Sequence, residues 1–165
     1  MEFKSDNDDI QVTDKLGGNA LNWAVQLGNY RFVKPLILAG VDINHESGAG
    51  KTPLMQAIGD GNQKLVEMFL SYGADVNHQC KKGGLYSSAL VFAIHRRPHY
   101  VLPLIKAGID MDTVDRHGVS MWTYLSDKVP DCIEQVRVLT SQKDNAKLKE
   151  VLPLLSTKPK SWPRL

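Results

Sequence analysis

Cysteines, long apolar segments and aromatic side chains are all scarce in this chain of 165 residues. Its two cysteines, Cys80 and Cys132, cannot form a disulfide framework or a Cys-x-x-Cys metal motif. No apolar run approaches the ~18 residues that indicate a membrane-spanning helix. The first residues, MEFKSDNDDI, are acidic and lack the apolar segment of a signal peptide. The chain as it stands is therefore expected in the cytoplasm, or in the periplasm if an upstream signal sequence has been removed.

A strong charge of one sign is missing as well. The 20 basic and 18 acidic residues leave a net charge of +2, which does not indicate nucleic-acid binding. The hydrophobic fraction of 42% is typical of a folded protein, and the length fits one domain or a short repeat array. No Ser/His/Asp or Cys/His order can be assigned, so no catalytic residue and no small-molecule substrate are predicted.

The stretch 50–75 predicts two helices joined by a tight turn. Thr52 and Pro53 begin the first helix, where the missing proline N–H costs nothing. Gly61 interrupts the pattern, and Gly73 ends the second helix in a left-handed conformation, after which an extended finger begins. The second helix carries an apolar stripe: Leu65, Val66, Phe69 and Leu70. A helical pair of this kind cannot bury its own stripe and needs a copy of itself on each side.

Copies of this stretch are present along the chain. Leu21 and Leu54 are 33 residues apart, Leu54 and Leu90 are 36 apart because residues enter near 81–88, and Leu90 and Trp122 are 32 apart. The start of the first helix recurs as Asn19-Ala20-Leu21-Asn22-Trp23-Ala24, Thr52-Pro53-Leu54-Met55-Gln56-Ala57, Ser88-Ala89-Leu90-Val91-Phe92-Ala93 and Ser120-Met121-Trp122-Thr123-Tyr124-Leu125. The finger recurs as Gly40-Val41-Asp42-Ile43-Asn44, Gly73-Ala74-Asp75-Val76-Asn77 and Gly108-Ile109-Asp110-Met111-Asp112.

These motifs resemble the ankyrin repeat family, whose signature is T-P-L-H-x-A followed by G-A-D-V-N, and the resemblance covers roughly residues 9–140. It implies an all-α solenoid of about four helix-turn-helix repeats with short β-turn fingers, in which the finger aspartates cap the local backbone. The expected division is a partial repeat at 1–16, repeats at 17–49, 50–83, 84–117 and 118–142, a capping helix at 143–155 and a flexible tail at 156–165. The last repeat should place its second helix at 131–141.

Two features depart from the family or suggest other chemistry. Pro35 and Pro103 fall within the predicted second helices, where each should remove a hydrogen bond and kink the helix. The run Gly48–Thr52 resembles the end of a phosphate-binding loop, which makes nucleotide binding or an enzyme an alternative of another class, although the required strand and long helix are not predicted around it.

The histidines do not suggest a metal site. His95 and His99 lie four residues apart, but Pro98 should break the helix between them, and His45 and His78 hold matching positions in successive fingers. Zinc needs three or four converging ligands, so no metal and no cofactor are expected. Trp23, Phe92 and Tyr124 share one helix position, which favours core or inner-face packing over a stacking platform for bases.

The resemblance implies a non-catalytic module that binds another protein through its concave face and finger tips. A basic cluster around the third repeat, which includes Lys81, Arg96 and Arg97, favours an acidic partner, with a merely solvated face as the alternative. The contact residues carried over from the family and from this cluster are Lys15, Leu16, Gln26, Leu27, Glu46, Lys51, Asp60, Gln79, Lys81, Lys82, Tyr86, His95, Arg96, Arg97, Arg116 and Asp127.

The partner can be narrowed only by analogy. Asn22 and Met55 stand where the family usually has histidine, and the array is short, so the chain is similar to small bacterial ankyrin proteins. Some of these neutralise a toxic enzyme, as immunity proteins do, and this is one hypothesis. The rival hypothesis is a eukaryotic or viral ankyrin adaptor or inhibitor. Neither hypothesis involves nucleic acid or a membrane span.

Overall fold

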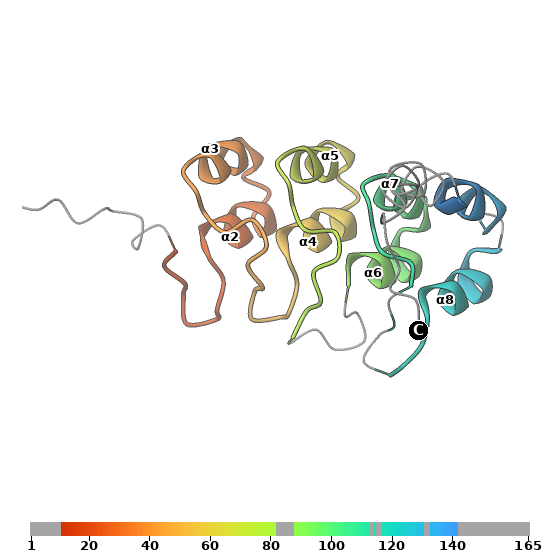
Figure 1. Ribbon diagram of the computed structural model, residues 1–165. Coiled ribbons are helices and arrows are strands. Elements are labelled where there is room, and N and C mark those ends of the chain that lie inside the picture. The colour runs from red at the N-terminus through yellow and green to blue at the C-terminus, as the bar shows by residue number, and fades with distance from the viewer. Residues whose placement is uncertain (1–10, 82–87, 113, 115–116, 131–132, 142–165) are drawn as a thin grey trace, which may run out of the picture.

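The computed structural model describes residues 11–81, 88–112, 114, 117–130 and 133–141, and they form an all-α solenoid. Figure 1 shows two layers of helices and a row of extended fingers. The layer beside the fingers holds α2 (Ala20–Gln26), α4 (Pro53–Asp60), α6 (Ala89–Arg96) and α8 (Met121–Lys128). The other layer holds α3 (Val33–Leu38), α5 (Gln63–Ser71), α7 (Val101–Lys106) and the helical residues 133–141. Within the described ranges the only extended pairing is two isolated bridges, Thr13 with Asn19 and Val114 with Ser120.

Each helix next to the fingers begins at a polar cap. The side chains of Asn19, Thr52, Ser88 and Ser120 accept a hydrogen bond from the backbone N–H three residues later. Such a cap satisfies one of the N–H groups that the first turn leaves without a partner. The predicted helix breakers are confirmed: Gly61, with φ 72°, ends α4, and Gly73, with φ 80°, follows the end of α5. Local sequence therefore sets the beginning and the end of these helices.

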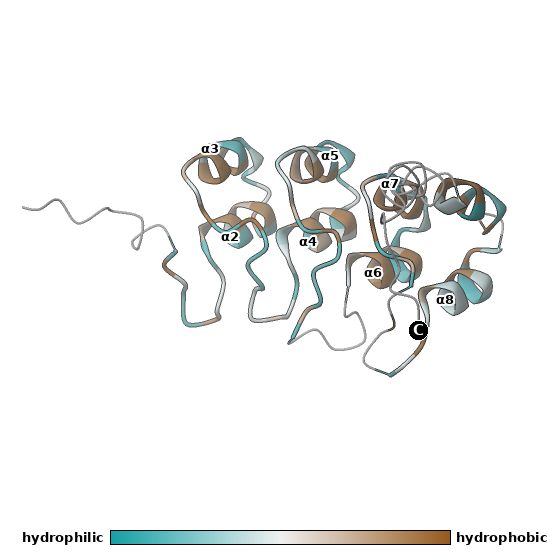
Figure 2. Cartoon of the chain, in the orientation of Figure 1, coloured by the Kyte–Doolittle hydropathy of each residue, from teal (hydrophilic) through white to brown (hydrophobic). Residues whose placement is uncertain are grey.

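The core lies between the two layers and between neighbouring repeats. Leu54 is 1% exposed, and its counterparts Leu21 and Leu90 are fully buried. Figure 2 shows hydrophobic colour where the helices meet and hydrophilic colour along much of the fingers. The fourth repeat keeps the repeat register, since its cap Ser120 follows Ser88 by the same 32 positions that separate Trp122 from Leu90. Trp122 is nonetheless only half-buried, whereas Met121 is 2% exposed and Leu125, one helical turn later, is fully buried.

The two prolines lie in the first turns of α-helices, not in the helix interiors where they were predicted. Pro35 and Pro103 are the third residues of α3 and α7, so their missing N–H groups belong to the first turn and would have no partner within the helix. Short 3-10 helices precede both, η1 (Tyr30–Phe32) and η2 (Pro98–Tyr100). The second helices of the first and third repeats therefore change from 3-10 to α winding two residues before the proline.

Carboxylates and carboxamides organise the fingers, which comprise residues 11–18, 41–51, 74–81 and the described part of 109–119. The carboxylates of Asp42, Asp75 and Asp110 each accept a 2.9 Å bond from the N–H two residues later, as the family resemblance implied. Successive fingers are joined by side-chain oxygens that accept from the next finger: Gln11 from Asp42 N–H at 3.1 Å, Asn44 from Asp75 N–H at 2.8 Å and Asn77 from Asp110 N–H at 2.7 Å. These bonds fix the spacing of the fingers.

The fourth repeat ends the described chain. In the helical residues 133–141, Val136 is fully buried and Ile133 and Leu139 pack against the core, whereas Val138 is 48% exposed. The predicted capping helix at 143–155 and tail at 156–165 lie outside the described residues. Among the described residues no helix has the length and apolar character to cross a membrane.

Candidate functional site

The fingers and the helices α2, α4, α6 and α8 together form one continuous face, which we call the inner surface (Figure 1). The predicted contact residues that the structure describes fall on its fingers and on or just after the last turns of these helices. The hydrogen bonds between fingers and the caps of the helices hold this face in place before any partner arrives. Little ordering entropy is then lost on binding.

A hollow of about 390 Å³ opens on the inner surface between the first two fingers and α2. Leu16 and Gln26, both predicted contact residues, line it together with Trp23. Leu16 is 67% exposed and Trp23 is half-buried, so the indole ring is still available at the floor. Leu27, just after α2, is also 64% exposed. This end of the molecule therefore offers apolar anchoring positions that a folded monomer does not need to expose.

The two fingers that enclose the hollow are in close contact. His45 Nε2 lies 2.9 Å from the carbonyl oxygen of Gly17, and the side-chain amide of Asn22 donates to the carbonyl of His45 at 3.1 Å. A Cβ added at Gly48 would lie 1.8 Å from the carbonyl oxygen of Leu16, so only glycine permits this approach. The rim of the hollow is thus fixed by side-chain hydrogen bonds to backbone carbonyls and by the close approach of the two fingers at Gly48.

Further along the inner surface the predicted contact residues are partly engaged with the molecule itself. The Lys51 ammonium lies 5.3 Å from the centre of the Phe92 ring, and Asp60 accepts a 2.8 Å bond from Gln56. His95 Nδ1 is 2.9 Å from the Val91 carbonyl oxygen, and its ring meets Tyr124 edge to face. These contacts hold the side chains of Lys51, Asp60 and His95 against neighbouring residues of the fold.

The basic cluster divides in the structure. Arg96 is exposed on the last turn of α6. Arg97 donates from Nε and Nη2 to the Gly59 carbonyl oxygen at 3.4 and 3.2 Å, and so interacts with the C-terminal end of α4 in the preceding repeat. Lys81 is exposed at the third finger. Arg97 therefore has a contact within the fold that the sequence did not indicate.

Glu46 is more enclosed than a finger-tip residue is expected to be. Its side chain is 14% exposed, accepts from the Lys81 N–H at 3.0 and 3.1 Å and pairs with His78 Nε2 at 3.0 Å. Cys80 lies beside this pair. Comparing each histidine with residues nearby in sequence does not reveal that Glu46, His78 and Cys80 lie together. The repeat period could have indicated this cluster, because it places residues about 33 positions apart on neighbouring fingers.

The other predicted contact residues are dispersed. Lys15 and Gln79 are exposed on the first and third fingers, and Asp127 is exposed at the end of α8, where it pairs with its neighbour Lys128 at 2.9 Å. Such an exposed pair contributes little to stability. Lys82, Tyr86 and Arg116 lie outside the described residues. All sixteen positions stay predictions as partner contacts.

The run Gly48–Thr52 is built as a finger turn. The N–H of Gly50 donates to the Ser47 carbonyl at 2.8 Å, and the N–H of Ser47 donates to the Lys51 carbonyl at 3.0 Å. A phosphate-binding loop instead presents its N–H groups to the ligand, follows a strand and opens a long helix. Here an extended finger precedes the run and the eight-residue α4 follows it. This geometry does not favour nucleotide binding.

Comparison with known proteins agrees with the geometry. Residues 5–80 and 21–115 match the family model described as ankyrin repeats (3 copies). A search of curated proteins found no significant match. The matched residues span more than half of the chain, and within them the structure has paired helices, glycine stops and hydrogen-bonded fingers at a period near 33 residues. The chain belongs to the ankyrin repeat family.

Proposed function

We propose that this chain binds an acidic protein partner through its inner surface, with the hollow at Leu16 and Trp23 as the apolar anchor site. Ankyrin repeats generally mediate protein–protein interaction and are typically non-catalytic, which supplies the coarse function. The observation that carries the finer proposal is the hollow of about 390 Å³, because its rim is fixed while an exposed leucine and a half-buried tryptophan line it. Binding energy concentrates at such apolar and aromatic anchors.

Four cations of this face support an acidic partner. Lys15 is exposed on the first finger, next to Leu16 in the sequence, Lys51 lies over the Phe92 ring, and Arg96 and Lys81 are exposed further along. Complementary charge raises the association rate and excludes wrong partners more than it increases affinity. An acidic surface carrying one protruding apolar side chain would complement this arrangement.

The test compares two exposed leucines. Leu16→Asp alters the hollow, whereas Leu38→Asp alters an equally exposed leucine on α3, 66% exposed and in the other helix layer. Each variant and the unmodified chain would capture partners from lysates of the source cells, with quantification by mass spectrometry. We expect a specific partner that is retained by Leu38→Asp and reduced at least ~10-fold by Leu16→Asp, the loss of about 1.4 kcal/mol. Equal capture by both variants would place the site elsewhere.

A second comparison tests the charge. The double variant Lys51→Glu with Arg96→Glu should slow association with the captured partner, whereas Lys34→Glu on α3 should leave the rate unchanged. Arg97 is left unaltered because it contacts α4. If the partner proves basic, or if its association rate is insensitive to salt and to these changes, the acidic-partner proposal fails.

The finer hypothesis of an immunity protein rests on analogy with small bacterial ankyrin proteins. It predicts that the product of a neighbouring gene co-purifies with the chain, is toxic when expressed alone and is tolerated when the two are expressed together. Loss of protection in Leu16→Asp would tie that role to the hollow. A partner that is a non-toxic signalling protein would instead support the adaptor hypothesis.

A further inference from the structure

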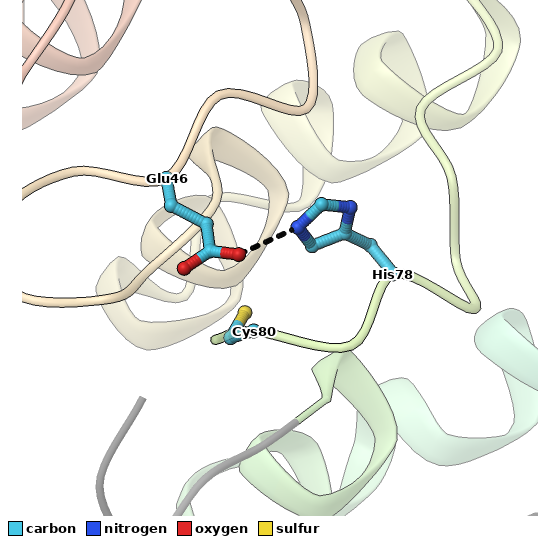
Figure 3. Close-up of side chains that lie close together, drawn as sticks. All are labelled: Glu46, His78 and Cys80. Carbon is cyan, nitrogen blue, oxygen red and sulfur yellow. Dashed lines mark hydrogen bonds and ion pairs between the residues drawn. The ribbon is translucent and has the colours of Figure 1, made fainter. Parts of the chain in front are cut away.

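Three side chains that can bind a metal meet between the second and third fingers. Glu46 comes from the second finger, and His78 and Cys80 come from the third. Their ligand atoms all lie within 4.8 Å of one another, and the Glu46 carboxylate is 3.0 Å from His78 Nε2. Figure 3 shows the carboxylate, the imidazole nitrogen and the sulfur turned toward one common point. This convergence is independent of the inner-surface hollow.

We propose that Glu46, His78 and Cys80 bind one zinc ion, with water as the fourth ligand. Thiolate, imidazole and carboxylate are the ligands zinc takes, at about 2.0–2.3 Å in a tetrahedral arrangement. That geometry separates ligand atoms by about 3.3–3.8 Å, so the widest pair must close by about 1 Å. Calcium and magnesium require oxygen ligands and do not fit a set containing sulfur and nitrogen.

The surroundings of the three ligands suit a metal ion. The backbone N–H of Lys81 donates to both oxygens of Glu46, at 3.0 and 3.1 Å, and so orients the carboxylate as outer-shell partners do in metal sites. Cys80 is 6% exposed and lies against Met55, with Sγ and Sδ 3.4 Å apart. His78 is 27% exposed, which leaves an entrance from solvent. On binding, zinc displaces the Cys80 thiol proton to solvent, whereas His78 ligates through Nε2 as a neutral ring that keeps its proton on Nδ1.

The ion would join two fingers that belong to successive repeats. Glu46 precedes α4, whereas His78 and Cys80 follow α5, so the metal closes a loop around the whole second repeat. A ligand that binds only the folded chain stabilises it by mass action. We expect zinc at 100 times its Kd to raise the Tm by about 5–10 °C, given the usual sensitivity of a chain of this size.

The experiment uses the untagged full chain, freed of metal by chelation and kept reduced. Zinc is titrated calorimetrically, and cobalt is added separately as a spectroscopic probe of thiolate ligation. We expect one zinc per chain, the Tm increase and a thiolate-to-cobalt charge-transfer absorption. Cys80→Ser and His78→Gln should each weaken zinc binding at least ~10-fold, since even outer-shell changes cost that much, and Cys80→Ser should abolish the absorption.

Matched controls separate this site from incidental binding. Cys132→Ser removes the other cysteine, and His99→Gln removes an exposed histidine outside the cluster. Both should bind zinc and cobalt as the unmodified chain does. His78→Gln tests a half-exposed position, so it remains informative if Cys80→Ser fails to fold. No stoichiometric zinc, or unchanged affinity in both ligand variants, would overturn the proposal.

Copper(I) is the competing ion, because it prefers thiolate and thioether ligands. Met55→Leu replaces the neighbouring thioether without removing any proposed zinc ligand. Unchanged zinc affinity in Met55→Leu supports the zinc site. If the chain binds only copper(I), and Met55→Leu removes that binding, the proposal is wrong.

Discussion

Arg97 has two possible roles, one in binding a partner and one in stabilising the fold. Its charge makes it a candidate for partner contact, but its guanidinium donates to the Gly59 carbonyl at the C-terminal end of α4. The last four carbonyls of a helix have no partner within that helix, and a cation there also interacts favourably with the helix dipole. Arg97 thus links the third repeat to the second.

Arg97→Met should lower the free energy of unfolding by about 1 kcal/mol, because it keeps the aliphatic stem and removes the exposed charge-assisted bond. Arg96→Met is the matched control, since Arg96 is exposed on the same turn, and should change it by less than about 0.5 kcal/mol. Urea unfolding monitored by circular dichroism measures both values. Equal effects of the two substitutions would assign Arg97 to the solvated surface.

Burial of the Tyr100 side chain makes the stability of the fold depend on pH in the alkaline range. The side chain is 3% exposed, and burial raises the pKa of Tyr100 above its ordinary value of 10.0, although the Arg97 charge opposes the shift and Glu67 adds to it. The unfolded chain therefore loses this proton first as the pH rises. Tyr100 contributes stability that is complete below about pH 10 and is lost as the pH rises through the folded-state pKa.

Tyr100→Phe has no proton to lose and should show a shallower decrease of unfolding free energy between about pH 9 and 11 than the unmodified chain. Tyr72→Phe, at a residue 37% exposed, is the control for the loss of a tyrosine hydroxyl. Unfolding in urea at a series of pH values measures the slopes. A Tyr100→Phe slope equal to that of the unmodified chain would contradict the shift.

In the described part of the chain the fingers have no β-sheet ladder between them, and side-chain hydrogen bonds keep neighbouring fingers in register. Asn77 accepts from the Asp110 N–H at 2.7 Å and donates from its amide to the Gly108 carbonyl at 3.3 Å. One carboxamide thereby satisfies a donor and an acceptor of the next finger. Asn44 makes the corresponding bond to Asp75.

Asn77→Ala should cost about 1 kcal/mol, because both bonds are exposed and each is worth on the order of 0.5–1.5 kcal/mol at most. Asn29→Ala, at an exposed residue whose side chain makes no capping bond, should be nearly neutral. Hydrogen exchange of the Asp110 amide adds a local measurement and should accelerate in Asn77→Ala. An unchanged exchange rate would mean that the bond does not protect that amide.

Helix packing contributes more to stability than these bonds do. Leu54 is 1% exposed on α4, which packs against α2, α5 and α6. Leu54→Ala should cost about 2–5 kcal/mol, as buried leucines do, and loosen the repeats on either side. Leu38→Ala, at 66% exposure, should cost less than about 0.5 kcal/mol. Thermal and urea unfolding would distinguish these values, and a small effect at Leu54 would contradict the repeat register.

The repeat architecture could be predicted because its signals are local. Caps such as Thr52, stops such as Gly61 and the period of Leu21, Leu54 and Leu90 each act within a few residues or recur regularly. The positions of Pro35 and Pro103 were misjudged because the sequence did not indicate the 3-10 turn that precedes each α-helix. Local sequence rules therefore predict that a helix is present better than they predict how its first turn is wound.

The candidate site was less accessible to prediction. Leu16 and Leu27 are exposed and stay predictions as partner contacts, whereas the enclosure of Glu46 depends on Lys81 and His78, more than 30 residues later. Trp122 follows Leu90 by 32 residues but is only half-buried, which the repeat spacing did not indicate. Contacts between repeats decide these details.

At the scale of the whole molecule, the described bonds from these carboxamide oxygens all run one way. Gln11, Asn44 and Asn77 each accept from the backbone of the finger that follows. The array therefore has a direction, and its first and last fingers have different hydrogen-bonding groups to offer. Asp112, in the position of Asn77, retains the accepting oxygen but has no amide with which to donate to a carbonyl.

This common direction makes the length of the array adjustable. Consider a duplicate of residues 42–74 inserted after Ala74. At the first junction the original Asn44 accepts from the N–H of the copied Asp42, and at the second the copied Asn44 accepts from the N–H of Asp75. Each junction therefore reproduces the bond between Asn44 and Asp75 that is already present. Such a chain should fold with one more repeat and show a larger urea m-value, because m grows with the surface exposed on unfolding. An unchanged m-value would mean that the inserted copy stays unfolded. The native chain is then one of several possible arrays that differ only in the number of repeats. A longer array would present a longer inner surface to a larger partner.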